Sequence, residues 1–138
     1  MIWKKTFELS DINKKSGHFT NPFNIEFIEK TDKFLICKML VTEDAKQPMG
    51  LLHGGVSVYL AETIGSYAGN LCIEAENKAA VGLEINANHL RGVRGGYVYA
   101  KAKPIHIGGK TQVWSIEISN EKQQLTCICR LTLAVISI

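Results

Sequence analysis

Hydrophobic positions recur with helical spacing between Gln47 and Leu71, in the segment QPMGLLHGGVSVYLAETIGSYAGNL. Apolar or weakly polar residues repeat there every three or four positions, which places them on one stripe of a helix. The members of the stripe are Val56, Tyr59, Leu60, Thr63, Ile64, Tyr67, Ala68 and Leu71. The pattern predicts a helix that buries this stripe as its core face.

The opposite side of the predicted helix carries small residues and one ionisable group. Its members are Gly55, Val58, Glu62, Gly65, Ser66 and Gly69. A glycine in a helix interior costs about 1 kcal/mol relative to alanine, so Gly65 and Gly69 indicate that a backbone or a ligand comes close on this side. Because this side has no charged, solvated surface, we expect the helix to be covered on both faces.

Glu62 is therefore expected to be a carboxylate in a crowded, mostly apolar setting. Such a setting prepares a carboxylate for proton transfer or nucleophilic attack. A carboxylate that is hydrogen-bonded to a neighbour for structural reasons alone is an equal alternative, because structural networks also hold ionisable groups in such places.

His53, Gly54 and Gly55 stand where the helix is predicted to begin. The first N–H groups of a helix have no partner within it and lie at the positive end of its dipole. They can hold a carbonyl oxygen that is becoming an oxyanion, and glycine lets a substrate approach closely. His53 and Gln47 could orient the carbonyl or a water, although a helix-capping histidine and a solvated loop glutamine are ordinary alternatives.

The distance between Gly54 and Glu62 predicts an oligomer. The two residues are eight positions apart, about 12 Å along one helix at ~1.5 Å per residue. That distance is too long for both to act on one carbonyl. If both are catalytic, they come from different subunits, so the sequence predicts a symmetric homodimer with two equivalent active sites shared between its subunits.

Alternating patterns on both sides of the helix predict strands. A hairpin is expected at 24–41, with its second arm largely covered on both faces, and further strands are expected at 80–90, 95–107, 111–119 and 125–136. Ser10 is expected to cap a short helix in the N-terminal arm, where His18 is expected at the surface. Together these elements predict one α+β domain over residues 1–138, with a curved antiparallel sheet wrapped around one long central helix.

Composition excludes several classes of function. The net charge of +3 comes from scattered residues, with no basic run longer than Lys4–Lys5 and Lys14–Lys15, so nucleic acid is not indicated as a partner. A mild positive charge could help to capture an anionic ligand, and solubility explains it equally well. No apolar run reaches membrane-spanning length and charges interrupt the start, so we expect a cytoplasmic protein without membrane contact.

Four cysteines, Cys37, Cys72, Cys127 and Cys129, lack the paired spacing of a zinc site. We expect them to be small, reduced core residues, with no metal bound.

The segment from Gln47 to Gly69, followed by VGLEINANHLRG and PIHIGGKTQVWSIEI, is similar to the hotdog-fold acyl-CoA thioesterases. Within them the chain most resembles the branch of the soil-bacterial 4-hydroxybenzoyl-CoA thioesterase and the 1,4-dihydroxy-2-naphthoyl-CoA hydrolases of the menaquinone pathway. The resemblance runs nearly end to end, and HGG followed by LAETIGS at this spacing is specific to that branch.

The resemblance assigns chemical roles. It implies that Glu62 is the general base or nucleophile and that the Gly54 N–H polarises the thioester carbonyl. It also implies that Gln47 and His53 position the reacting group, and that Ser66 lies near the attacking water or the leaving thiolate.

The resemblance also suggests binding residues, which are Gly55, His89, Arg91, His106, Gly108 and Lys110. His89 and Arg91 are expected near the acyl and CoA portions, the alternative being a polar strand end with Arg91 solvated. The turn at residues 106–110 could receive nucleotide phosphates on its N–H groups and Lys110. A plain hairpin turn explains its two glycines equally well.

The expected reaction is hydrolysis of an acyl-CoA to the free acid and CoA, without metal or redox cofactor. An aromatic acyl group, with 1,4-dihydroxy-2-naphthoyl as one candidate, is expected by analogy alone. Glu62 would either deprotonate water or attack to form a mixed anhydride, and the sequence leaves both routes open. A non-catalytic acyl-CoA-binding module of hotdog fold is the alternative, and a homotetramer of two dimers is implied only by the resemblance.

Overall fold

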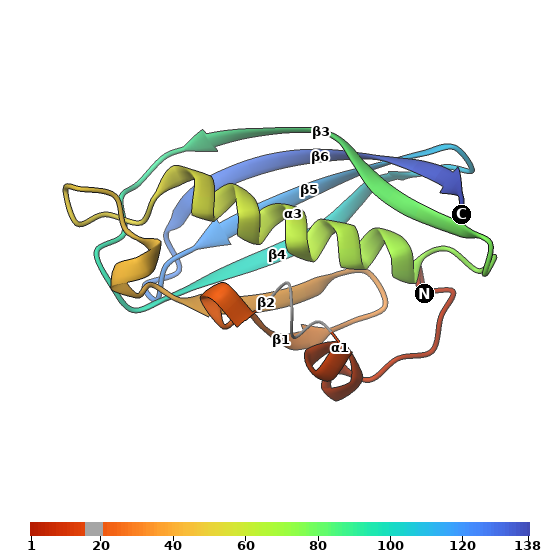
Figure 1. Cartoon of the computed structure of the whole chain (residues 1–138), viewed down its shortest axis with the longest axis horizontal. Helices are drawn as coiled ribbons and strands as arrows, with labels where there is room; N and C mark the ends of the chain where they lie inside the picture. The colour runs from red at the N-terminus through yellow and green to blue at the C-terminus, as the bar shows by residue number, and fades with distance from the viewer. Residues whose placement is uncertain (16–20) are drawn as a thin grey trace.

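The computed structural model describes residues 1–15 and 21–138, and the predicted position of His18 lies outside them. In this part of the chain six strands form one curved antiparallel sheet, and the long helix α3 (Gly54–Leu71) lies along its concave face (Figure 1). The strands are β1 (Glu26–Lys30), β2 (Leu35–Leu40), β3 (Lys78–His89), β4 (Tyr97–Ile107), β5 (Thr111–Ser119) and β6 (Leu125–Ser137). The predicted α+β architecture is confirmed.

The strand order is β1-β2-β4-β5-β6-β3. The β1–β2, β4–β5 and β5–β6 neighbours are hairpins between consecutive strands, as the alternating patterns predict. β3 follows α3 but pairs with β6 at the far side of the sheet. Its other edge therefore faces no strand among the described residues.

The core lies between the sheet and α3. β4, β5 and β6 each bury one alternating face, as predicted, because residues two apart on a strand point to the same side. The buried side chains from these strands include Val98, Ala100, Ala102, Trp114, Ile116, Ile118, Leu131 and Leu133. All four cysteines are free and buried in this core, which confirms their expected structural role.

The buried face of α3 differs from the predicted stripe. It consists of Ser57, Leu60, Ala61, Ile64, Gly65, Ala68 and Gly69. A methyl group on Gly65 would lie 2.5 Å from Cδ2 of Leu131, and one on Gly69 would collide with Leu133. The glycines do mark a close approach, but the approaching group is the sheet and not a ligand or another helix. The predicted stripe was therefore right for Leu60, Ile64 and Ala68 and wrong for its other members, and α3 has one face that the sheet does not cover.

Two smaller predictions also fail. Ser10 lies inside the short helix α1 (Leu9–Lys15) and does not cap it. Instead, Asn13 ties α1 to β1, since its side chain donates to the Phe27 carbonyl at 3.0 Å and accepts from the Phe27 N–H at 2.8 Å. The outer face of β2 is only partly covered, with Leu40 exposed at 40%.

Two 3-10 helices, Asn21–Phe23 and Glu43–Ala45, complete the described elements, and the second lies in the loop that leads to α3. No helix in residues 1–15 and 21–138 is long and apolar enough to span a bilayer.

Candidate active site

The start of α3 leaves one backbone donor unused. His53 is the N-cap residue, and its Nδ1 accepts a hydrogen bond from the Gly55 N–H at 2.9 Å. The N–H groups of Val56 and Ser57 donate to the His53 carbonyl at 2.9 and 3.2 Å. Within the described residues, the Gly54 N–H has no hydrogen-bond partner. It therefore points out of the positive end of the helix as a free donor.

The cap also defines the chemical state of His53. An Nδ1 that accepts a hydrogen bond carries no proton, so the neutral ring holds its proton on Nε2. The side chain is exposed, so Nε2–H is accessible to a ligand. His53 is thus a helix cap, as the ordinary alternative stated, and it still offers a donor beside Gly54.

Gln47 closes the loop before α3 and is not simply a solvated side chain. Its backbone N–H donates to the Leu51 carbonyl at 2.8 Å, and its carbonyl accepts from the Gly50 N–H at 2.9 Å. Its side-chain oxygen accepts from the Met49 N–H, which leaves the amide NH2 as the group available to a ligand.

A cavity of about 400 Å³ lies beside this helix start. Its lining residues are Gln47, Leu51, Leu52, Gly54, Ser57, His89, Leu90, Arg91, Gly92, Val93 and Thr126. His89 packs closely against Gly54, because a methyl group there would lie 3.0 Å from its Nε2. Arg91 is exposed and makes no ion pair with any described residue. This cavity, the donor cavity, therefore combines hydrogen-bond donors with a positive charge.

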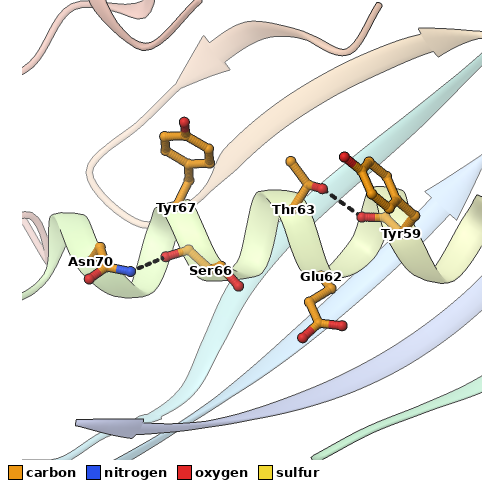
Figure 2. A pocket seen from close by; sticks show the side chains of 6 residues that line it. All are labelled: Tyr59, Glu62, Thr63, Ser66, Tyr67 and Asn70. Atoms are coloured by element: carbon orange, nitrogen blue, oxygen red, sulfur yellow. Dashed lines mark hydrogen bonds between the residues drawn. The ribbon is translucent and has the colours of Figure 1, made fainter. Parts of the chain in front are cut away.

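A second cavity of about 590 Å³ lies along the uncovered face of α3 (Figure 2). Its lining residues are Tyr59, Glu62, Thr63, Ser66, Tyr67 and Asn70. Glu62 is half-buried, and its carboxylate has no hydrogen bond or ion pair within the part of the chain that the structure describes. The alternative that Glu62 serves a structural network therefore has no support here. We call this second space the carboxylate cavity.

One protomer does not bring the two cavities together as one site. Gly54 lies at the start of α3 and lines the donor cavity, whereas Glu62 lies two turns further along and lines the carboxylate cavity. Ser66 shares the carboxylate cavity, whereas Gln47, His89 and Arg91 share the donor cavity.

The turn between β4 and β5 lines neither cavity. It lies at the end of the sheet remote from the start of α3 (Figure 1). The Gly108 N–H donates to the Thr111 carbonyl at 2.9 Å, so it is already used within the hairpin. A methyl group on Gly108 would lie 2.5 Å from Nε2 of His106, which packs over the turn. At Gly108 the geometry favours the plain hairpin alternative, while Lys110 is exposed.

Four residues of the carboxylate cavity were not identified as site residues from the sequence. Tyr59, Thr63 and Tyr67 were predicted to be core, and Asn70 was not singled out. All four are half-buried. For Tyr59 and Tyr67 the signal is a polar atom on an apolar body, which indicates a surface that is only partly covered.

The cysteines offer no alternative nucleophile. Burial raises the pKa of the Cys72 thiol to about 11 and raises the pKa of Cys37 further. The Sγ atoms of Cys127 and Cys129 lie 3.6 Å apart, and hydrogen bonding between them lowers the pKa of Cys127 and raises that of Cys129. Both are only 1% exposed, so a substrate cannot reach either sulfur.

Comparison with known proteins defines the class. The family model of the thioesterase superfamily matches residues 49–127. The chain is 50% identical over 137 residues to 1,4-dihydroxy-2-naphthoyl-CoA hydrolase of Escherichia coli, covering 99% of this chain and 100% of the relative. It is 47% identical over 111 residues to the Listeria monocytogenes protein of the same name, covering 80% and 89%.

Solved structures agree with this assignment. A thioesterase from Haemophilus influenzae matches with a TM-score of 0.95 at 50% identity, covering 99% of this chain and 96% of that one. A mutant thioesterase from Pseudomonas aeruginosa matches with a TM-score of 0.97 at 42% identity over 100% of both chains. The chain therefore belongs to the thioesterase superfamily, has the hotdog fold and is a thioester hydrolase, as the resemblance implied.

Proposed function

We propose that this protein hydrolyses an aromatic acyl-CoA to the free acid and CoA, at sites shared between two subunits. The observation that supports this most is the pair of unused groups on one helix, the Gly54 N–H and the Glu62 carboxylate. A thioesterase needs a donor for the carbonyl oxygen and a base or nucleophile for the carbonyl carbon. The two groups lie about 12 Å apart along α3, so both reach one thioester only across an interface.

The open edge of β3 supports the dimer. β3 has 12 residues, and β6 pairs with only one of its edges. Leu83 is exposed at 64% beside this free edge. Exposed edge strands readily pair with another chain, and a two-fold axis would place the same edge of two copies together. Such a dimer would set the donor cavity of one subunit against the carboxylate cavity of the other.

The proposed chemistry follows from the groups present. The thioester oxygen accepts from the Gly54 N–H, and the amide of Gln47 and Nε2–H of His53 orient the reacting group. Glu62 removes a proton from water as the water oxygen bonds to the acyl carbon, or its oxygen attacks that carbon directly. In the first route the C–S bond then breaks and the thiolate takes the proton that Glu62 removed from water. In the second route the C–S bond breaks to leave a mixed anhydride between Glu62 and the acyl group, and water then hydrolyses this anhydride, which releases the free acid, restores Glu62 and supplies the proton for the thiolate. Ser66, one helical turn from Glu62 in the same cavity, lies near the water or the thiolate.

CoA is proposed to be held by cationic and donor groups. Arg91 makes no ion pair among the described residues and can donate two parallel hydrogen bonds to a phosphate. His89 packs against Gly54 and Gly55 follows Gly54 in α3, so we propose that both lie near the reacting carbonyl. The turn with His106, Gly108 and Lys110 lies away from both cavities, so we propose that it meets CoA from another subunit, within a dimer or a homotetramer.

The lining of the carboxylate cavity supports the proposal that the acyl group is aromatic. Tyr59 and Tyr67 form part of its lining, and each ring is held edge-on by a phenylalanine, at 5.2 Å from Phe23 and 5.1 Å from Phe27. Fixed aromatic rings favour stacked or edge-to-face contact with a planar ligand. The names of the relatives from E. coli and L. monocytogenes make 1,4-dihydroxy-2-naphthoyl-CoA the first candidate.

A thiol-release assay with aromatic, branched and straight-chain acyl-CoAs tests the substrate. We expect kcat/KM to be highest for bicyclic or monocyclic aromatic thioesters, because only these match the ring contacts. Equal turnover of straight-chain substrates would contradict the aromatic assignment. Binding without turnover of any thioester would favour the acyl-CoA-binding module.

Mixing two inactive variants tests the shared site. Glu62→Gln removes the carboxylate and Gly54→Pro removes the donor, so each variant alone is expected to be nearly inactive. After joint refolding at equal amounts, about one quarter of the sites combine an intact donor with an intact carboxylate, and activity is expected to return to about a quarter of wild type. Activity no higher than the mean of the separate variants would show that each site belongs to one chain.

A further inference from the structure

β3 contains an irregularity next to the carboxylate cavity. Gly82 lies opposite Leu133 of β6 and Glu84 lies opposite Thr132, so Leu83 is an extra residue in the pairing. This is a β-bulge, which bends a strand and changes the direction of nearby side chains. Bulges are frequent beside active sites because they place one group where a regular ladder would not.

The Glu62 carboxylate lies next to Gly82, in the place that a side chain at position 82 would otherwise fill. A methyl group built on Gly82 would collide with Oε1 of Glu62 and lie 3.6 Å from its Cδ. No other described atom would lie within 4 Å of that methyl. The Glu62 carboxylate therefore occupies the space that the missing side chain leaves open. Gly65 and Gly69 are different, since methyl groups there would meet buried side chains of the sheet, which are leucine and isoleucine at Gly65 and mainly Leu133 and Gln112 at Gly69.

The distance between β3 and α3 at this point is fixed by Asn70. Its side chain accepts from the Ala80 N–H at 2.9 Å and donates to the Ala80 carbonyl at 2.9 Å. The same amide nitrogen donates to the Ser66 carbonyl at 2.9 Å (Figure 2). Ala80 is two residues before Gly82 on the same face of β3. The strand therefore cannot easily move away from the helix to make room for a larger residue at position 82.

We infer that Gly82 is a positioning residue, whose missing side chain lets the Glu62 carboxylate lie against the β3 bulge and fixes its direction. This inference rests on the proposed role of Glu62 in hydrolysis. The colliding atom is the end of a flexible side chain, so a methyl at position 82 displaces the carboxylate without disturbing the core. The change is thus expected to affect the reaction and to leave folding intact.

Gly82→Ala tests the inference. We expect kcat for an acyl-CoA substrate to fall about 10- to 100-fold, because a shift of about 1 Å in a reacting group has effects of this size. KM is expected to change less than about threefold, and the thermal midpoint and gel-filtration volume are expected to match wild type, because substrate-binding groups and core stay in place. Gly95→Ala is the matched control, since a methyl there meets nothing within 4 Å.

A double-mutant cycle with Glu62→Asp separates positioning from a general effect. The shorter aspartate withdraws its carboxylate from Gly82, so adding Gly82→Ala to Glu62→Asp is expected to lower kcat by less than about twofold. The same fold loss in both backgrounds would overturn the inference, as would an unfolded Gly82→Ala variant or wild-type kcat in it. If Glu62→Gln itself kept full activity, the proposed role of Glu62 would fail instead, which distinguishes the two failures.

Discussion

Glu62→Gln is expected to lower kcat by about 10³-fold, which corresponds to about 4 kcal/mol of lost transition-state stabilisation. Glutamine has the size and shape of glutamate but can neither accept a proton from water nor attack the carbonyl carbon. Because the carboxylate makes no structural hydrogen bond or ion pair among the described residues, the substitution is expected to leave the unfolding temperature near that of wild type. Steady-state thiol release and thermal unfolding measure the two effects.

Glu74→Gln provides the control for this variant. Glu74 is exposed in the connection after α3 and lines neither cavity, so the same chemical change there is expected to leave kcat unchanged. Wild-type turnover in Glu62→Gln would remove the carboxylate from the mechanism. Incorporation of oxygen-18 from water into Glu62 during a single turnover would favour the anhydride route, and its absence would count against that route.

The sheet could be predicted from the sequence because its signal is local. Alternation in β4, β5 and β6 places large apolar side chains on one face, and the observed buried residues follow that alternation closely. The helix could be predicted for the same reason, and so could the places of Glu62 within it and of Gly54 at its start. Glu62 is the only acid between Gln47 and Leu71, and Gly54 is one of two glycines at the start of the helix.

The faces of α3 could not be predicted because they depend on what packs against them. Tyr59 and Tyr67 fit an apolar stripe by spacing, yet they line the carboxylate cavity. Gly65 and Gly69 indicate a close approach in the sequence, but only the structure shows that side chains of β6 make it. The Gly82 bulge is likewise a property of the pairing between β3 and β6, which are distant along the chain. Long-range register therefore determines the details of the site that local periodicity cannot show.

Gly54→Pro is expected to lower kcat by about 10²- to 10³-fold, because proline removes the N–H proposed to hold the developing oxyanion. The helix itself should tolerate the change. Gly54 is the first residue of α3, a position that proline favours, and its N–H has no partner in the helix. His53 has φ −63° and ψ 131°, within the region that a residue before proline adopts.

Gly54→Ala is the matched control, because it adds a Cβ at the same place and keeps the N–H. That Cβ lies 3.0 Å from Nε2 of His89 in either variant, so any effect of crowding His89 is shared. If the alanine and proline variants unfold at the same temperature, the ratio of their kcat values therefore reports the contribution of the backbone donor alone. Equal kcat in the two would place the oxyanion on another donor, and the amide of Gln47 would then be the first group to test, because it lines the same cavity.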